Sequence, residues 1–199
     1  INNYGFKNKY NIYLKNLNTI GKNDSLYKSS PQVELMGILE LNTSLPMIKQ
    51  TEKNINYLTP KASIRFNPGD MKDYRSSDRS INVDGIFDIN RLAIDDSFEE
   101  GKSLTLGLEY KKTELNDINQ FFEAKIATVY RNKNEKFIPN SSVINGKDSN
   151  IFGSISNNLS EFINISYDFI LDNDFNTLEY NSLNTSINYK NLNTSFNFI

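Results

Sequence analysis

The sequence predicts an all-β fold, with about nine antiparallel strands in one sheet. Two observations support this prediction. Apolar residues recur at every second position in successive segments, and polar, turn-rich stretches separate those segments at hairpin spacing. No segment shows a convincing helical period. Because a period of two puts successive side chains on opposite faces of a sheet, each predicted strand has one apolar face and one polar face.

The two clearest strands lie at the ends of residues 54–112. The first places on one face Leu58, Ala62, Ile64 and Phe66, and on the other Lys61, Ser63 and Arg65. In the second, Ser103, Thr105, Gly107, Glu109 and Lys111 alternate with Leu104, Leu106, Leu108 and Tyr110. Between the strands, Asn67-Pro68-Gly69-Asp70 is a turn signal, because Pro presets φ and Gly accepts a positive φ.

The other segments continue the same pattern along the chain. The predicted strands cover residues 4–15, 31–43, 54–67, 102–112, 120–131, 151–157, 161–171, 175–190 and 191–199. We expect a tight turn near Asn158 and another near Lys190-Asn191. The segment 161–171 alternates most cleanly, with Asn164 and Asp168 on its polar face.

The predicted connections alternate in length. Long polar loops cover about residues 16–30, 68–101 and 132–149, whereas the connections at 44–53, 113–118 and near Asn158 are shorter. In a soluble β-sandwich the apolar faces would form the core; in an outer-membrane barrel they would meet lipid and the polar faces would line a lumen. Periodicity leaves both open, but long loops at one end favour a transmembrane barrel. The short turn at 172–174 departs from this rule.

The composition excludes several kinds of site. The 199 residues include 24 acidic and 22 basic side chains, a net charge of −2, so we expect no nucleic-acid partner. The chain has no Cys and no His, which removes disulfides, the ordinary catalytic triad and His-based zinc sites. We predict no catalytic residue, no metal site and no cofactor. No apolar run approaches the ~20 residues of a membrane helix.

Four segments within the central stretch carry a resemblance to a known family. They are a strand from Pro60 to Phe66, a Phe followed by Asn-Arg in Phe87–Arg91, an acidic step in Glu99–Gly101, and a Leu-Thr-Leu-Gly-Leu-Glu-Tyr strand in Leu104–Tyr110. In order and spacing they resemble the LPS-assembly protein family, LptD or OstA, of Gram-negative outer membranes. The resemblance extends over roughly residues 54 to 180.

One departure from the family pattern limits what carries over. Many members have Asp-Arg a few residues after Asn-Arg, whereas this chain has Asp95-Asp96-Ser97. No role that depends on that second Arg is therefore assigned here.

The resemblance implies a piece from the middle of a large barrel in the cell outer membrane, within the translocon that inserts lipopolysaccharide (LPS) into the outer leaflet. It implies transport without catalysis. The implied partners are LPS, outer-membrane lipid and a lipoprotein that plugs the lumen. The periplasmic LPS bridge would bind a domain outside this chain. The start at Ile1 and the alternation that continues to Ile199 also suggest a fragment.

Two other interpretations stay open. One is a general porin-type barrel, and the other is a soluble β-sandwich adhesin or carbohydrate-binding module. A porin would conduct ions without dependence on LPS, and a soluble sandwich would bury its aromatic faces. The match to the family pattern argues against both.

The resemblance and the alternation each nominate site residues. Asn90, Arg91 and Gly101 match the family signature, and we expect them to order the long loop or its junction with the wall, since a guanidinium has five donors. Candidate lumen-facing residues are Lys61, Arg65, Glu109, Lys111, Glu123, Lys125, Arg131, Asn164 and Asp168. In a barrel they would line a water-filled lumen and guide a phosphorylated glycolipid, or simply neutralise one another.

Four acidic residues form the last candidate site. Asp95, Asp96, Glu99 and Glu100 could bind Ca²⁺ or Mg²⁺, but they lack the spacing of a known calcium loop. Paired carboxylates for glycoside cleavage are a weaker alternative. We expect a solvated acidic loop.

Overall fold

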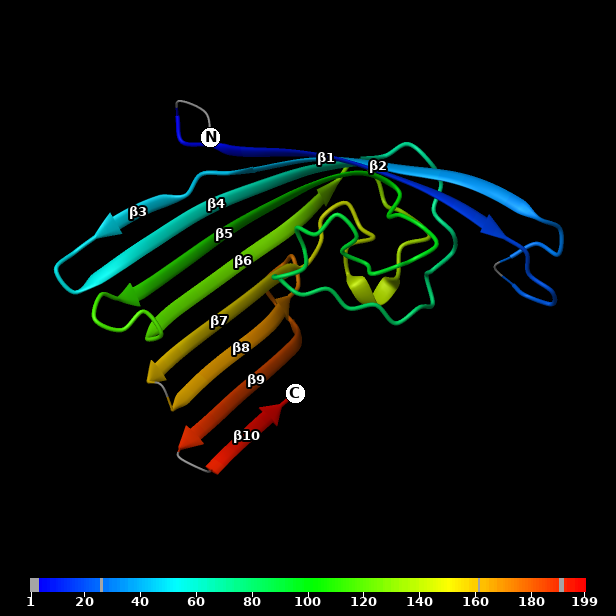
Figure 1. Cartoon of the computed structure of the whole chain (residues 1–199). Coiled ribbons are helices and arrows are strands. Elements are labelled where there is room, and N and C mark those ends of the chain that lie inside the picture. The colour runs from blue at the N-terminus through cyan, green and yellow to red at the C-terminus, as the bar shows by residue number, and fades with distance from the viewer. Residues whose placement is uncertain (1–3, 26, 161, 190–191) are drawn as a thin grey trace.

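The computed structural model describes residues 4–25, 27–160, 162–189 and 192–199. These residues form a single antiparallel sheet of ten strands, in the order β1-β2-β4-β5-β6-β7-β8-β9-β10, with β3 paired to β4 (Figure 1). The strands are β1 (Lys7–Thr19), β2 (Gln32–Ser44), β3 (Met47–Gln50), β4 (Asn54–Asn67), β5 (Gly101–Glu114), β6 (Phe121–Arg131), β7 (Ile151–Ser160), β8 (Ile163–Leu171), β9 (Leu178–Tyr189) and β10 (Leu192–Phe198). The predicted all-β antiparallel fold is confirmed, and the sheet of this chain is not closed.

The tenth strand, β3, was missed because the sequence predicts a plain connection at residues 44–53. In the structure β2 and β3 pair with β4 in one continuous register, Ser44 opposite Lys61 and Met47 opposite Leu58. The break between them falls opposite Pro60, whose carbonyl accepts from the N–H of Leu45 at 3.0 Å. Because an antiparallel residue directs its N–H and C=O to the same neighbour, the missing N–H of Pro60 interrupts only this ladder.

Several predicted boundaries were wrong by a few residues. β1 continues to Thr19, so the first long connection covers residues 20–31 and not 16–30. Asn158 does not mark a turn; it pairs with Asn164 inside the β7–β8 ladder. The turn predicted at Lys190-Asn191 lies outside the described residues. The other two long connections cover residues 68–100 and 132–150, at the same end of the sheet as 20–31 (Figure 1).

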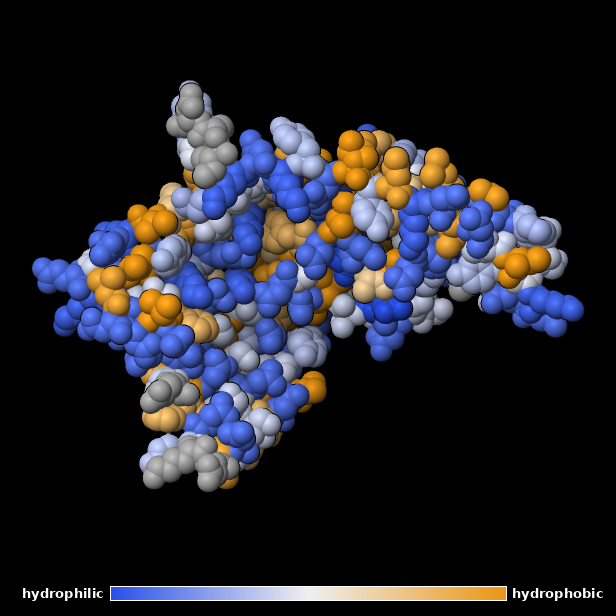
Figure 2. Space-filling model, in the orientation of Figure 1, coloured by the Kyte–Doolittle hydropathy of each residue, from blue (hydrophilic) through white to orange (hydrophobic). Residues whose placement is uncertain are grey.

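One face of the sheet is apolar and exposed. Ile64 is 55% exposed, and on the neighbouring strands Leu106, Leu108 and Ile126 are 41%, 41% and 45% exposed. A soluble β-sandwich would bury this face in its core, so this exposure does not fit that interpretation. Figure 2 shows hydrophobic side chains gathered along the upper edge formed by β1 and β2, and hydrophilic side chains over much of the rest of this view. Among the described residues, no helix is long and apolar enough to cross a membrane.

The opposite, inward face carries an unexpected hydrophobic core at the long-loop end. The loops 68–100 and 132–150 fold back over the sheet there (Figure 1), although the sequence predicts them as polar loops. The core consists of the loop residues Met71, Ile81, Val83, Ile86, Leu92, Ile94, Ile138 and Ile144 and the strand residues Ala127, Val129 and Phe152. The strand residues occupy inward positions, so part of the inward face is apolar at the end that the loops cover.

Candidate functional site on the inward face

The predicted polar-face residues all lie on the inward face, but the structure divides them into two groups. Toward the short-turn end, Glu109 lies opposite Lys125 and Lys111 lies opposite Glu123. Ion pairs join several of these side chains: Lys61 pairs with Glu109, and Lys125 lies 2.9 Å from Glu123 and 2.7 Å from Asp84 of the loop. Asn164 and Asp168 lie on the same face in β8, with Asp168 opposite Ser154.

The second group, Arg65 and Arg131, lies beneath the loops with the signature residue Arg91. The guanidinium of Arg91 binds Glu99 with two nitrogens, with Nε 2.6 Å from Oε2. Arg131 also pairs with Glu99, and Arg65 pairs with Glu40 at 2.9 Å and approaches Glu99 at 3.7 Å. All five side chains are almost fully buried. Arg65 and Arg131 thus share a face of the sheet with the other predicted residues, and the loops bury both side chains there.

Arg91 also joins its loop to the wall. Its Nη1 donates to the hydroxyl of Thr105 at 2.9 Å, and its Nη2 to that of Ser103 at 3.2 Å, both on β5. Within the loop, Nη1 lies 3.4 Å from the carbonyl of Ile86. The same guanidinium thus contacts its own loop and the neighbouring strand.

Arg65 and Arg131 make the reciprocal contacts from the wall to the loops. Nε of Arg131 donates to the carbonyl of Ile144 at 2.7 Å, and Nη1 donates to that of Glu100 at 3.1 Å. Arg65 donates to the carbonyl of Asp88. These bonds satisfy loop carbonyls that packing against the sheet removes from water.

The arginines set the charge state of Glu99. Burial alone would raise the pKa of this carboxyl, but the charges of Arg91 and Arg131 outweigh burial and hold the pKa well below its ordinary value. Glu99 is therefore ionised at neutral pH. The expectation of a solvated acidic loop was wrong for Glu99 and Asp96, which are 7% and 9% exposed.

Asp96 anchors a different pair of loops. Its carboxylate accepts hydrogen bonds from the hydroxyls of Tyr27, in loop 20–31, and Tyr74, and lies 3.4 Å from Nζ of Lys72. The hydrogen bond to Asp96 raises the pKa of Tyr27 to about 12. Within the described ranges, no group of three or more acidic, His or Cys side chains could hold a metal ion.

Asn90 and Gly101, the other two signature residues, have local roles. The side chain of Asn90 donates to the carbonyl of Ile94 at 3.0 Å and accepts from its N–H at 3.4 Å. Gly101, the first residue of β5, has a φ of +79°, a conformation that favours glycine.

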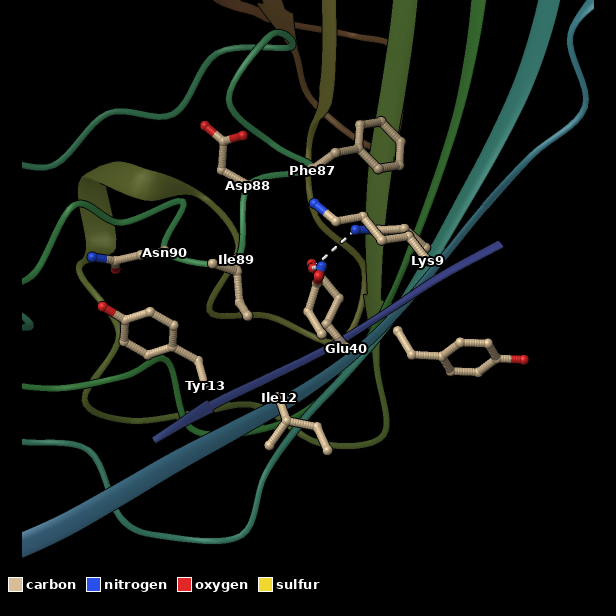
Figure 3. A pocket seen from close by; sticks show the side chains of 11 residues that line it. Lys9, Ile12, Tyr13, Glu40, Phe87, Asp88, Ile89 and Asn90 are labelled. Carbon is tan, nitrogen blue, oxygen red and sulfur yellow. Dashed lines mark hydrogen bonds between the residues drawn. The ribbon is translucent and has the colours of Figure 1, made fainter. Parts of the chain in front are cut away.

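A cavity of about 640 Å³ lies beside the arginine cluster, between the β1–β2 hairpin and residues 87–90 (Figure 3). Figure 3 shows Lys9, Tyr13 and Glu40 projecting from the hairpin toward the loop segment that carries Phe87 to Asn90. Glu40 accepts from the side-chain amides of Asn11 at 2.7 Å and Asn42 at 2.9 Å, and from Arg65. It thereby connects the cavity to the cluster.

Glu40 lies between Leu39 and Leu41, so alternation predicts it on the polar face of its strand, although it is not among the predicted site residues. Alternation also predicts Lys9 and Asn11 on the polar face, so the same signal could have identified them. No local signal showed that a loop would approach them. The cavity offers amides, an ammonium group, a carboxylate and the ring of Phe87, a set suited to binding polar or charged groups.

In the comparison with protein families, residues 6–198 match LptD, described as LPS transport system D. The search of curated proteins found no match. The matched family transports and assembles LPS at the outer membrane, and membership implies LPS as substrate and a partner lipoprotein. Since the match covers nearly every residue, and the structure is the all-β sheet expected of such a barrel, the chain belongs to the LptD family.

Proposed function

We propose that this sheet is part of the wall of the translocon that inserts LPS into the outer leaflet of the outer membrane, and that it acts by transport without catalysis. The observation that carries the proposal is the two-sided sheet. Its exposed apolar face is suited to lipid, and its inward face carries charged side chains suited to a hydrated lumen.

The uncovered part of the inward face is the proposed path for the sugar and phosphate portion of LPS. Lys61, Lys111 and Lys125 lie there beside Glu109 and Glu123, so cations that can bind phosphate alternate with carboxylates that weaken binding. Such a mixed surface favours passage over tight retention. The acyl chains would leave laterally into lipid.

The loops close the other end of this face. We assign to Asn90, Arg91 and Gly101 the role of ordering loop 68–100 and its junction with β5, on the basis of the contacts described above. Because the loops cover the long-loop end, the polar part of LPS would pass beside or below them. The cavity between β1–β2 and residues 87–90 leaves room for LPS or for the plug lipoprotein.

Two adjacent lysines offer a matched test. Lys111 lies on the inward face opposite Glu123, and Lys112 lies on the outward face opposite Phe122. A photo-crosslinking residue is placed at each position of the full-length protein in cells. The residue at 111 should capture LPS only while transport is active, and the residue at 112 should capture membrane lipid whether or not transport runs.

The outcomes separate the candidate functions. Absence of LPS adducts at 111 in a strain with normal LPS export would contradict the proposed path. If the purified protein also conducted ions without any dependence on LPS, the porin-type interpretation would replace it.

A further inference from the structure

The outward face of the sheet carries aromatic side chains near both ends of its central strands. Toward the short-turn end, the rings of Tyr110 in β5 and Phe122 in β6 have centroids 6.2 Å apart. Toward the long-loop end lie Phe66 and Tyr130, each the second-to-last residue of its strand. Outer-membrane barrels place aromatic girdles at the two membrane interfaces, with an apolar band between them. The same arrangement gives this sheet two recognisable membrane levels.

Two exposed lysines on the outward face of β5 mark the edges of the apolar band. Lys102 lies opposite Phe66, and Lys112 lies opposite Phe122. The strand between the lysines covers about 34 Å along its length, or about 26 Å across a membrane at a tilt of about 40°. That span agrees with the band of about 25 Å in outer-membrane barrels. Because the longer loops of such barrels are extracellular, Lys102 corresponds to the outer-leaflet edge.

An apolar groove of about 310 Å³ adjoins Lys102 on the outward face. The side chains of three neighbouring strands form it: Tyr10, Ile12, Leu39, Leu41, Ile64 and Phe66. Asn11 and Glu40 also line it, but their side chains are hydrogen-bonded to each other on the inward face. Nζ of Lys102 lies 5.1 Å from the centre of the Phe66 ring. The ammonium group therefore lies at the long-loop end of the groove.

Lys102 differs from lysines of the inward face in its partners. Lys61 and Lys125 each pair with a glutamate, whereas Lys102 forms no ion pair within the part of the chain that the structure describes. Its ammonium group is thus available to an anion at the outer-leaflet edge. Past the groove, the outward face of β1 continues with the exposed residues Asn16 and Asn18. Their amides can both donate to and accept from sugar hydroxyls.

We propose that Lys102 and the six apolar side chains of the groove bind one phosphorylated glycolipid of the outer leaflet, namely LPS. An acyl chain occupies the groove, a phosphate pairs with Lys102, and sugar hydroxyls reach Asn16 and Asn18. This assignment rests on the proposed function, which puts the apolar face in lipid and the long-loop end at the outer leaflet. The site lies on the outer side of the wall, so its occupant is a resident lipid and not LPS in transit along the inward face.

The experiment uses the full-length protein with a photo-crosslinking residue at position 64, in nanodiscs of phosphatidylethanolamine. The nanodiscs contain a fixed amount of phosphatidylglycerol and an increasing amount of LPS, and the LPS fraction that gives half-maximal adduct is measured. Lys102→Ala should raise this fraction about fivefold, the effect of one cation near a lipid headgroup. Lys102→Arg keeps the charge and should match wild type. Lys112→Ala removes the lysine at the opposite edge of the band and should also match wild type.

A second crosslinking position covers the case in which a probe at 64 fills the groove. Position 106, on the outward face of β5, leaves every groove residue unchanged and should show the same dependence on Lys102. Equal half-maximal LPS fractions in wild type and Lys102→Ala would overturn the proposal. So would capture of phosphatidylglycerol in preference to LPS, because the site would then recognise a phospholipid. Nanodiscs require no transport, so this result is separate from LPS capture at position 111, which tests the transport path.

Discussion

Arg91 and Glu99 lie eight residues apart in one loop and form a buried ion pair, in which two nitrogens of the guanidinium contact the carboxylate. Two wall residues, Arg65 and Arg131, reach the same carboxylate from β4 and β6. The loop is thus held to the sheet through a charge that three cations surround. Removing one partner of a buried pair is costlier than never burying the pair, because the other charge stays uncompensated.

We therefore predict that Arg91→Ala lowers the free energy of unfolding by about 3–5 kcal/mol. The measurement is urea denaturation of the purified protein in detergent. Arg75→Ala, in the same loop, is the control: Arg75 and its partner Asp73 are 54% and 44% exposed, so the loss should stay within about 1 kcal/mol. Equal losses in the two variants would show that the Arg91 contacts contribute nothing beyond an ordinary surface pair.

The low pKa of Glu99 predicts that the stability of the protein depends on pH. Its stabilisation is fully present above the unfolded pKa of 4.5 and is lost as pH falls through the lower folded value. The difference in unfolding free energy between wild type and Glu99→Gln should be constant above about pH 5 and shrink in more acidic solution. A difference that grew on acidification would contradict the ionised state of Glu99.

Gly101→Ala should loosen the junction between the loops. The substitution combines a positive φ of +79° with a collision between Cβ and the carboxyl of Glu135, and we expect a loss of about 1–3 kcal/mol. Gly69→Ala is the control, since its Cβ would meet only Oδ1 of Asn67 at 3.4 Å. Thermal unfolding of both variants tests this prediction, and matching transition temperatures would refute it.

Asp96→Ala should release loop 20–31 from loop 68–100, because Tyr27 loses its hydrogen-bond acceptor. Amide hydrogen exchange in residues 20–25 and 27–31 should increase about tenfold, equivalent to about 1.4 kcal/mol. Asp95→Ala changes the preceding exposed residue and should leave exchange in this loop as in wild type. Unchanged protection in Asp96→Ala would mean that other contacts hold the loop.

The strands and their two faces were predictable because alternation of apolar and polar residues depends only on neighbouring positions, as in Leu104–Tyr110. The loop core was harder to predict. Val129 and Phe152 occupy inward positions and could have suggested a covered inward face, but the segments that cover them lie elsewhere in the chain. The burial of Glu99 was likewise invisible, since it depends on Arg131, 32 residues away. The resemblance to the family nominated Asn90, Arg91 and Gly101, but the contacts of each could come only from the structure.

The two sides of β4 resist lateral separation unequally, because the ladder with β2 and β3 is interrupted at Pro60 and the ladder with β5 is not. β4 pairs with β5 without interruption from Asn54 to Asn67. On its other side, β2 pairs only from Leu39 to Ser44 and β3 only from Met47 to Gln50. The part of β2 that precedes Leu39, back to Gln32, pairs with β1 alone. A force that pulled neighbouring strands apart would therefore meet fewer hydrogen bonds here than at the β4–β5 ladder, and the β1–β2 hairpin would detach as one unit before β4 left β5.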